Sequence, residues 1–167
     1  MELLEFIRAQ VASVHQNLGL SMEDLTDEIA HIRAGGTTNT IAQILAHMVT
    51  GQDLLISEKL RGLPTLHESG WAAKTGVPAN RIDIWQDHGW RLNLEAFNAF
   101  RLAVQANSTS FVDALQPAEL DLPRTWIRGP ERPLGMLLQT IFINHALGHC
   151  GEISALKGVQ GLKGLPI

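Results

Sequence analysis

The feature that most constrains the fold is a helical spacing of apolar residues. Four segments of the 167-residue chain repeat apolar side chains at alternating steps of three and four, the period of one face of an α-helix. The first segment carries Leu4, Ile7, Val11, Val14 and Leu18. Gly19 is typical of a helix end. No segment alternates cleanly at period two, as a half-buried strand does, so we expect an all-α protein.

The other three helices have recognisable boundaries. The second is expected to begin near residues 38–40, where Thr and Asn side chains can cap free N–H groups, and to stop at Pro64. The third is expected over roughly residues 92–115. The fourth is expected to start at Pro133, which suits a first helical position, and to reach about Lys157.

Two long connections separate these helices. Residues 63–90 and 117–133 are rich in Pro and Gly, and the first is expected to hold at most a short helical turn. Long connections in compact domains are unusual and often functional. Together the segments predict an up-and-down four-helix bundle with long crossover connections, in one domain covering residues 1–167.

Composition and charge narrow the functional classes. The chain is 45% hydrophobic and 18% charged, which excludes disorder. Its formal net charge of −4 argues against a nucleic-acid or anionic-membrane partner. The start of the chain is acidic, unlike a signal peptide, and no apolar run is long enough to span a membrane. We therefore expect a soluble, cytoplasmic protein.

Histidine is the unusual residue, with seven in the chain against a single Cys. His145 and His149 are four residues apart on the apolar stripe of the fourth helix, so both imidazoles can reach one metal ion. His47 lies on the inner stripe of the second helix and is the expected third ligand. The alternative is that these are core histidines, each with its own hydrogen-bond partner.

Several known site types do not fit. No Glu stands between His145 and His149, so the general base of the zinc-protease motif is missing. A di-iron bundle site needs two Glu-x-x-His units. The chain has one, residues 28–31, in a stretch that reads as loop. A single Cys excludes disulfide scaffolds and cysteine-based zinc sites.

Glycines lie close to the candidate ligands. Gly148 and Gly151 fall inside the fourth helix, and Gly51 follows His47 by one turn. Each interior helical Gly costs about 1 kcal/mol relative to Ala, which suggests a packing reason. That reason is either room beside a metal for a substrate or the close approach of another helix.

Residues 144–153, together with residues 39–48 and 68–78, resemble the DinB-like family of metal-binding four-helix proteins. The resemblance covers nearly the whole chain. It implies an up-and-down bundle with a long crossover, and a divalent metal, commonly zinc or nickel, on His47, His145 and His149. It also implies a homodimer, since dimers are common in the family.

The resemblance leaves the activity open, because characterised relatives include thiol-dependent transferases and an isomerase while many members have no known activity. Three neutral ligands leave open metal positions, as catalytic sites do, and a dication there would favour the anionic form of a bound thiol. A low-molecular-weight-thiol S-transferase acting on a small-molecule substrate is the first expectation. A metal-dependent hydrolase and a non-enzymatic stress-response metal-binding dimer are the alternatives.

Two neighbours of the histidines need separate interpretations. Glu152 follows His149 by three residues on the same face. It is interpreted as an acceptor that orients a ligand histidine, as a fourth ligand, or as a proton acceptor for substrate. Cys150 points about 100° away from His149 on the helix and is expected in the core.

Asp53 and the other four histidines are expected outside the ligand set, although His67 and His88 flank the long connection that could line the site. Asp53 follows His47 by six residues and reads as a solvated charge. The other histidines lack a ligand partner at useful spacing and read as surface or loop residues; they are His15, His31, His67 and His88. An anionic thiol would need a cation near the metal, and the arginines in or near the crossovers are Arg61, Arg81, Arg91, Arg124 and Arg128.

Overall fold

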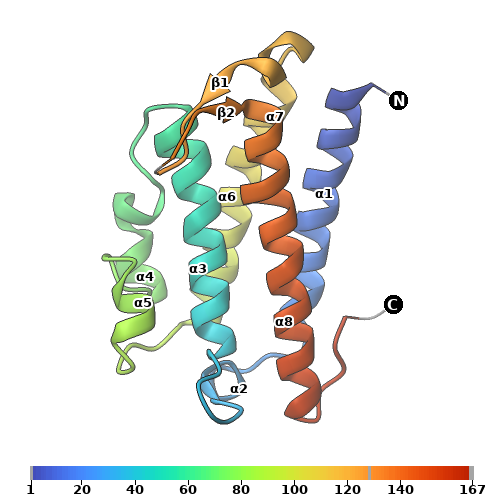
Figure 1. The fold of residues 1–167 in the computed structure, drawn as a ribbon. Coiled ribbons are helices and arrows are strands. Elements are labelled where there is room, and N and C mark those ends of the chain that lie inside the picture. The colour runs from blue at the N-terminus through green and yellow to red at the C-terminus, as the bar shows by residue number, and fades with distance from the viewer. Residues whose placement is uncertain (1, 128, 166–167) are drawn as a thin grey trace.

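Four long helical rods form the protein in a computed structural model that describes residues 2–127 and 129–165 (Figure 1). The first is α1 (Leu3–Ser21) and the third is α6 (Leu94–Ala114). The second rod is α3 (Ile41–Asp53), continued without a break by the π-helical η1 (Leu54–Leu60). The fourth rod joins α7 (Leu134–Leu137), the π-helical η4 (Leu138–Asn144) and α8 (His145–Val159).

The rods are arranged as a bundle in which α1 and α3 each pack against both α6 and α8. Figure 1 shows α8 in front and α6 behind, with α3 and α1 to either side. The apolar stripes of the four rods meet along the axis and form one core, in which Phe97, Phe100 and Phe142 are the largest fully buried side chains. The expected all-α bundle is confirmed.

The helix α3 is enclosed on every side, because every residue in it except His47 is buried. Burial around the whole circumference is typical of a helix in a protein interior. Thr40 caps its start: the Oγ1 atom accepts the N–H of Gln43, and Gln43 Oε1 accepts the N–H of Thr40. The half-exposed His47 is thus the one residue through which α3 reaches the surface.

The connection between η1 and α6 covers one side of α3. It contains η2 (His67–Trp71), α4 (Ala72–Thr75) and α5 (Asp83–Gln86), more helix than the single short turn expected from the sequence. It returns the chain along the bundle, so that α3 and α6 run parallel (Figure 1).

Two side-chain hydrogen bonds fasten this connection to α3 on either side of His47. Gln43 Nε2 donates to the carbonyl of Ile84 at 3.0 Å, and Arg81 Nε donates to Thr50 Oγ1 at 3.2 Å. Gln43 precedes His47 by four residues and Thr50 follows it by three, so both anchors share a helix face with His47. The connection is therefore held directly over the histidine.

The second connection stays at one end of the bundle instead of crossing it (Figure 1). It holds the short helix η3 (Pro117–Asp121), which contacts α7, and a two-stranded antiparallel pair formed by β1 (Pro123–Arg124) and β2 (Arg132–Pro133). The sequence predicted loop here, because strands of two residues leave no periodic signal.

Two local predictions were wrong. The first helix continues past Gly19 to Ser21, whose Oγ donates to the carbonyl of Asn17 at 2.7 Å. Residues 28–31 are not loop but lie in α2 (Asp27–His31), which Thr26 caps by accepting the N–H of Ile29.

Candidate metal centre

Three imidazole nitrogens converge between α3 and α8. The Nε2 atom of His145 lies 3.0 Å from Nε2 of His47 and 3.1 Å from Nε2 of His149. The three ligand atoms all lie within 4.8 Å of one another. The sequence brought these same three residues together as candidate ligands, and the structure places them in one cluster.

The cluster has the chemistry of a divalent-cation site. Each neutral ring carries one proton, and the three facing nitrogens lie too close together for three N–H groups to point inward. Zinc–imidazole bonds of about 2.0–2.1 Å require ligand nitrogens to lie roughly 3.0–3.4 Å apart, and the two closest pairs fall in this range. One cation bound by the lone pairs of all three nitrogens therefore fits the residues present.

Glu152 fixes one of these lone pairs. The Nδ1–H group of His149 donates to Glu152 Oε2 at 2.9 Å, which leaves the lone pair of that ring on Nε2. A carboxylate in this position orients a ligand histidine and raises its basicity. Of the three interpretations of Glu152, the hydrogen bond favours the orienting acceptor.

The pKa values of two cluster residues are lowered. Burial, the neighbouring histidines and Arg81 lower the pKa of His47 to about 4. Burial, His149 and Arg81 lower the pKa of His145. Both rings are therefore neutral near pH 7, the form that binds metal.

The histidine face of the fourth rod differs from the predicted core stripe. His145 and His149 are half-buried, and Glu152 is exposed, whereas Ala146 and Cys150 are buried. The core stripe is thus displaced by one residue, because the π-helical η4 changes the rotation per residue just before His145. The cluster lies at the edge of the core, within reach of solvent, and Cys150 is the core residue that was expected.

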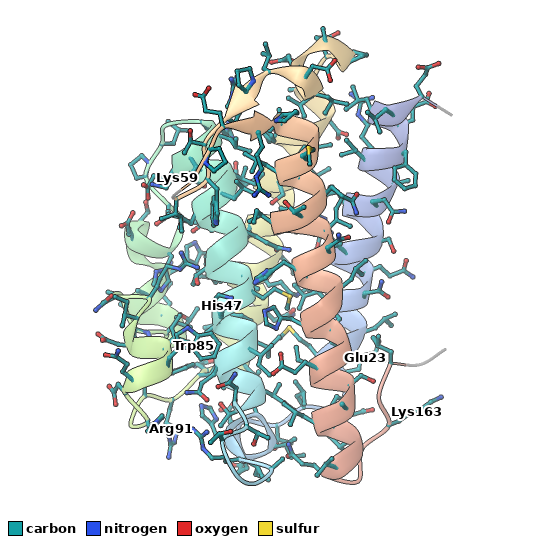
Figure 2. All side chains as sticks on the ribbon, viewed as in Figure 1. Glu23, His47, Lys59, Trp85, Arg91 and Lys163 are labelled. Atoms are coloured by element: carbon teal, nitrogen blue, oxygen red, sulfur yellow. The ribbon has the colours of Figure 1, made fainter. Side chains whose placement is uncertain are left out.

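An aromatic side chain that sequence reasoning missed lies against the cluster. Trp85, on α5, has its ring centroid 5.0 Å from that of His47, and Figure 2 shows the two side by side. The bond between Gln43 and the carbonyl of Ile84 holds α5 in this position. No local pattern marks Trp85, because only the path of the connection brings it to α3.

The prediction that Asp53 is a solvated charge was wrong. Its side chain is fully buried. The carboxylate accepts the Ser57 hydroxyl and the backbone N–H groups of Leu66 and His67, at 2.8, 3.1 and 2.8 Å. It thereby fastens the start of the connection to the end of α3, which explains why a charge is tolerated there.

The four remaining histidines stay outside the cluster, but two of them were misplaced. His15 and His67 are buried, not on the surface. His31 lies in α2 and accepts the N–H of Leu92 on Nε2 at 3.0 Å. His88 is exposed in a loop, as expected.

A packing reason was expected for the glycines near the candidate ligands, and the structure provides one at only one of them. A Cβ atom on Gly148 or Gly151 would have nothing within 4 Å, so the described residues give neither glycine a packing reason. At Gly51 the nearest atom is Nη2 of Arg81, at 3.4 Å from the Cβ position. Only Gly51 therefore has a neighbour, which is the guanidinium group beside the cluster.

Of the five arginines in or near the crossovers, Arg81 approaches the histidines. The other described ones are engaged elsewhere: Arg61 donates to Asn107, Arg91 is exposed, and Arg124 donates to a neighbouring backbone carbonyl. Arg128 lies outside the described residues.

Comparison with known proteins gives the family. The DinB superfamily profile matches residues 5–153. A conserved protein from Enterococcus faecalis, known from its crystal structure, is similar in fold with a TM-score of 0.75. The sequences are 15% identical over 95% of this chain and 97% of that one. No curated protein matches the sequence significantly. The described helices include none that is long and apolar enough to cross a membrane. The chain belongs to the DinB superfamily.

Proposed function

We propose that His47, His145 and His149 bind one divalent metal ion, zinc or nickel, and that the protein is a metal-dependent enzyme of the low-molecular-weight-thiol S-transferase type. The observation that carries the proposal is the convergence of three Nε2 atoms at the edge of the core. Three protein ligands leave further positions open to a small molecule, as in catalytic sites.

The chemistry supplied by such a cation is electrostatic: it stabilises the anionic form of a thiol close to it. The protein has a single Cys, and Cys150 is buried with its pKa raised by burial. The reacting thiol is therefore an external molecule. Its sulfur forms the new bond to an electrophilic carbon, and the leaving group departs with the electrons of the broken bond.

The surroundings favour a transferase over a hydrolase. A hydrolase needs a general base beside the metal, and Glu152 is already engaged with His149. Trp85 offers an apolar wall beside His47, and Arg81 supplies a positive charge. These features suit a small organic anion.

The metal assignment is tested by metal content per chain, measured after purification and loading with zinc or nickel. We expect about one ion per chain in the wild type and less than roughly a tenth of that in His149→Ala. His88→Ala, which changes an exposed histidine, is the matched control and keeps the wild-type content. Equal content in the wild type and His149→Ala would contradict the assignment.

The activity is tested by metal-dependent conjugation of a chlorobimane electrophile with a panel of cellular thiols. The proposal predicts turnover in the metal-loaded wild type that is lost in His149→Ala. Stoichiometric metal without turnover for any thiol would favour the non-enzymatic stress-response role instead.

The homodimer and the cytoplasmic location also belong to the proposal. Exposed apolar side chains at one end of the bundle support the dimer, and Leu3, Phe6 and Met136 line a groove of about 350 Å³ there. Light scattering coupled to size exclusion measures the mass directly, and a monomer would contradict this part of the proposal.

A further inference from the structure

Arg81 holds its guanidinium group over the turn of α3 next to His47. Its Nε donates to Thr50 Oγ1 at 3.2 Å, and Nη2 lies 3.4 Å from the Cβ position of Gly51. Thr50 and Gly51 follow His47 by three and four residues, so all three lie on neighbouring parts of one helix face. The guanidinium and the histidine cluster are therefore adjacent.

Arg81 is not held in a close ion pair with any described residue. Among the described residues, Arg81 forms no ion pair within 4 Å and donates one side-chain hydrogen bond. Asp53 and Glu58 attract the Arg81 charge from a longer distance. The oxygens of Asp53 already accept three other groups. Arg81 is half-buried, and its terminal nitrogens form no hydrogen bond with the described residues, so their four N–H groups remain available to a ligand.

The charge of Arg81 acts on the candidate ligands. It contributes to the lowered pKa of both His47 and His145. A dication held by the cluster would add a second positive charge near this guanidinium, and two neighbouring positive charges favour the binding of an anion.

The surroundings also limit the side on which an anion can bind. Arg81 borders a cavity of about 30 Å³ together with His67 and Glu68. That cavity has room for a water molecule and not for a substrate. The anion therefore belongs on the side of the guanidinium nearer to the histidines.

We propose that Arg81 binds the carboxylate of a short bifunctional substrate whose thiol end reaches the histidine cluster, an inference that rests on the proposed function. The planar fork of an arginine matches a carboxylate with two parallel N–H···O bonds. The substrate class is thus a small mercapto acid, and a neutral thiol of the same size lacks the anchoring group.

The test compares two thiols that differ only in charge, 3-mercaptopropionate and 3-mercaptopropionamide, by calorimetric titration of zinc-loaded protein. The variants are Arg81→Met and Arg81→Lys, with Arg91→Met as the control. Arg91 carries the same charge on an exposed loop and points away from His47 (Figure 2). Metal content is measured on every variant before titration.

We expect Arg81→Met to weaken binding of the mercapto acid by about 10- to 100-fold and to leave amide binding within about twofold. Arg81→Lys restores part of the affinity, because it keeps the charge but not the fork. Arg91→Met behaves as the wild type. Wild-type protein that holds zinc but binds both thiols equally would overturn the role of Arg81 while leaving the metal site intact.

A wild type that binds no metal would instead overturn the proposed function. The role of Arg81 is then decided in the metal-free protein, where propionate should raise the Tm of the wild type and not that of Arg81→Met. Equal Tm values with and without propionate would overturn it.

Discussion

The histidine cluster and the His15 site show two ways of burying an imidazole in one bundle. Burial lowers the pKa of both His47 and His15 to about 4. The His15 ring packs edge-on against Phe142, with centroids 5.8 Å apart, and neither ring nitrogen has a partner among the described residues. The His47 nitrogen instead meets two others. The lowered pKa values are therefore alike although His15 is buried and His47 half-buried, and the convergence of lone pairs distinguishes the candidate ligand.

The largest expected effect is a loss of zinc affinity that a substitution in the histidine cluster causes and a substitution of His15 does not. His145→Ala removes the central nitrogen of the cluster, so we expect zinc affinity to fall by at least about 100-fold. His15→Leu should leave zinc affinity unchanged, since His15 has no second ligand near it. Competition with a chromophoric chelator measures both affinities, and a comparable loss in His15→Leu would show that the two sites are not distinct.

The next effect concerns acid stability. The pKa of His15 is about 4 in the folded protein, below its unfolded value of 6.5, so the unfolded state binds the extra proton between these values. The stabilisation by neutral His15 is complete above pH 6.5 and is lost as the pH falls towards 4. Between pH 7 and pH 5 this costs about 2 kcal/mol.

Urea unfolding of metal-free protein at several pH values checks this window. His15→Leu should lose less stability than the wild type over the same range, by about 2 kcal/mol. His88→Leu changes an exposed ring and should follow the wild type. Parallel curves for wild type and His15→Leu would show that His15 is not buried in its neutral form.

An effect of similar size is expected at the acceptor of His149. Glu152→Gln removes the negative charge that orients the ring and strengthens its basicity, which typically costs about 10- to 100-fold in metal affinity. The control is Glu23→Gln, an exposed side chain at the lower end of the bundle (Figure 2). Unchanged zinc affinity in Glu152→Gln would show that the Glu152 carboxylate does not support metal binding through His149.

The smallest effect concerns two glycines, of which only Gly76 is required by the backbone conformation and by its close neighbours. Gly148→Ala adds a methyl group in open space and should stabilise α8 by up to about 1 kcal/mol. Gly76→Ala should destabilise, because the glycine has a φ of 75° and the new Cβ would lie 2.1 Å from the Arg91 carbonyl oxygen. Thermal unfolding gives both signs, and a destabilised Gly148→Ala would reveal an unseen neighbour of α8.

The ligands were predictable from sequence because each lies on a long helix, where the spacing of residues fixes which side chains share a face. His47 follows as their partner from its place on the inner stripe of the second helix, and the family resemblance implies the same residue. The exact face of the fourth rod was not predictable, since the π-helical η4 shifts the core stripe by one residue just before His145.

The surroundings of the cluster were less accessible to sequence reasoning. Asp53, Arg81 and Trp85 acquire their positions from a connection whose path depends on contacts between residues distant in sequence. A carboxylate six residues after His47 reads as solvated until the connection that it fastens is known. Arg81 was named as a candidate cation, but nothing local set it apart from the other arginines.

The central claim is that three nitrogens bind one ion at a single place. Anomalous diffraction at the zinc absorption edge, on crystals of zinc-loaded protein, tests it most directly. The account predicts one peak per chain, about 2.0–2.1 Å from Nε2 of His47, His145 and His149. A peak at His15 or His67 instead, or no peak among the three rings, would contradict it.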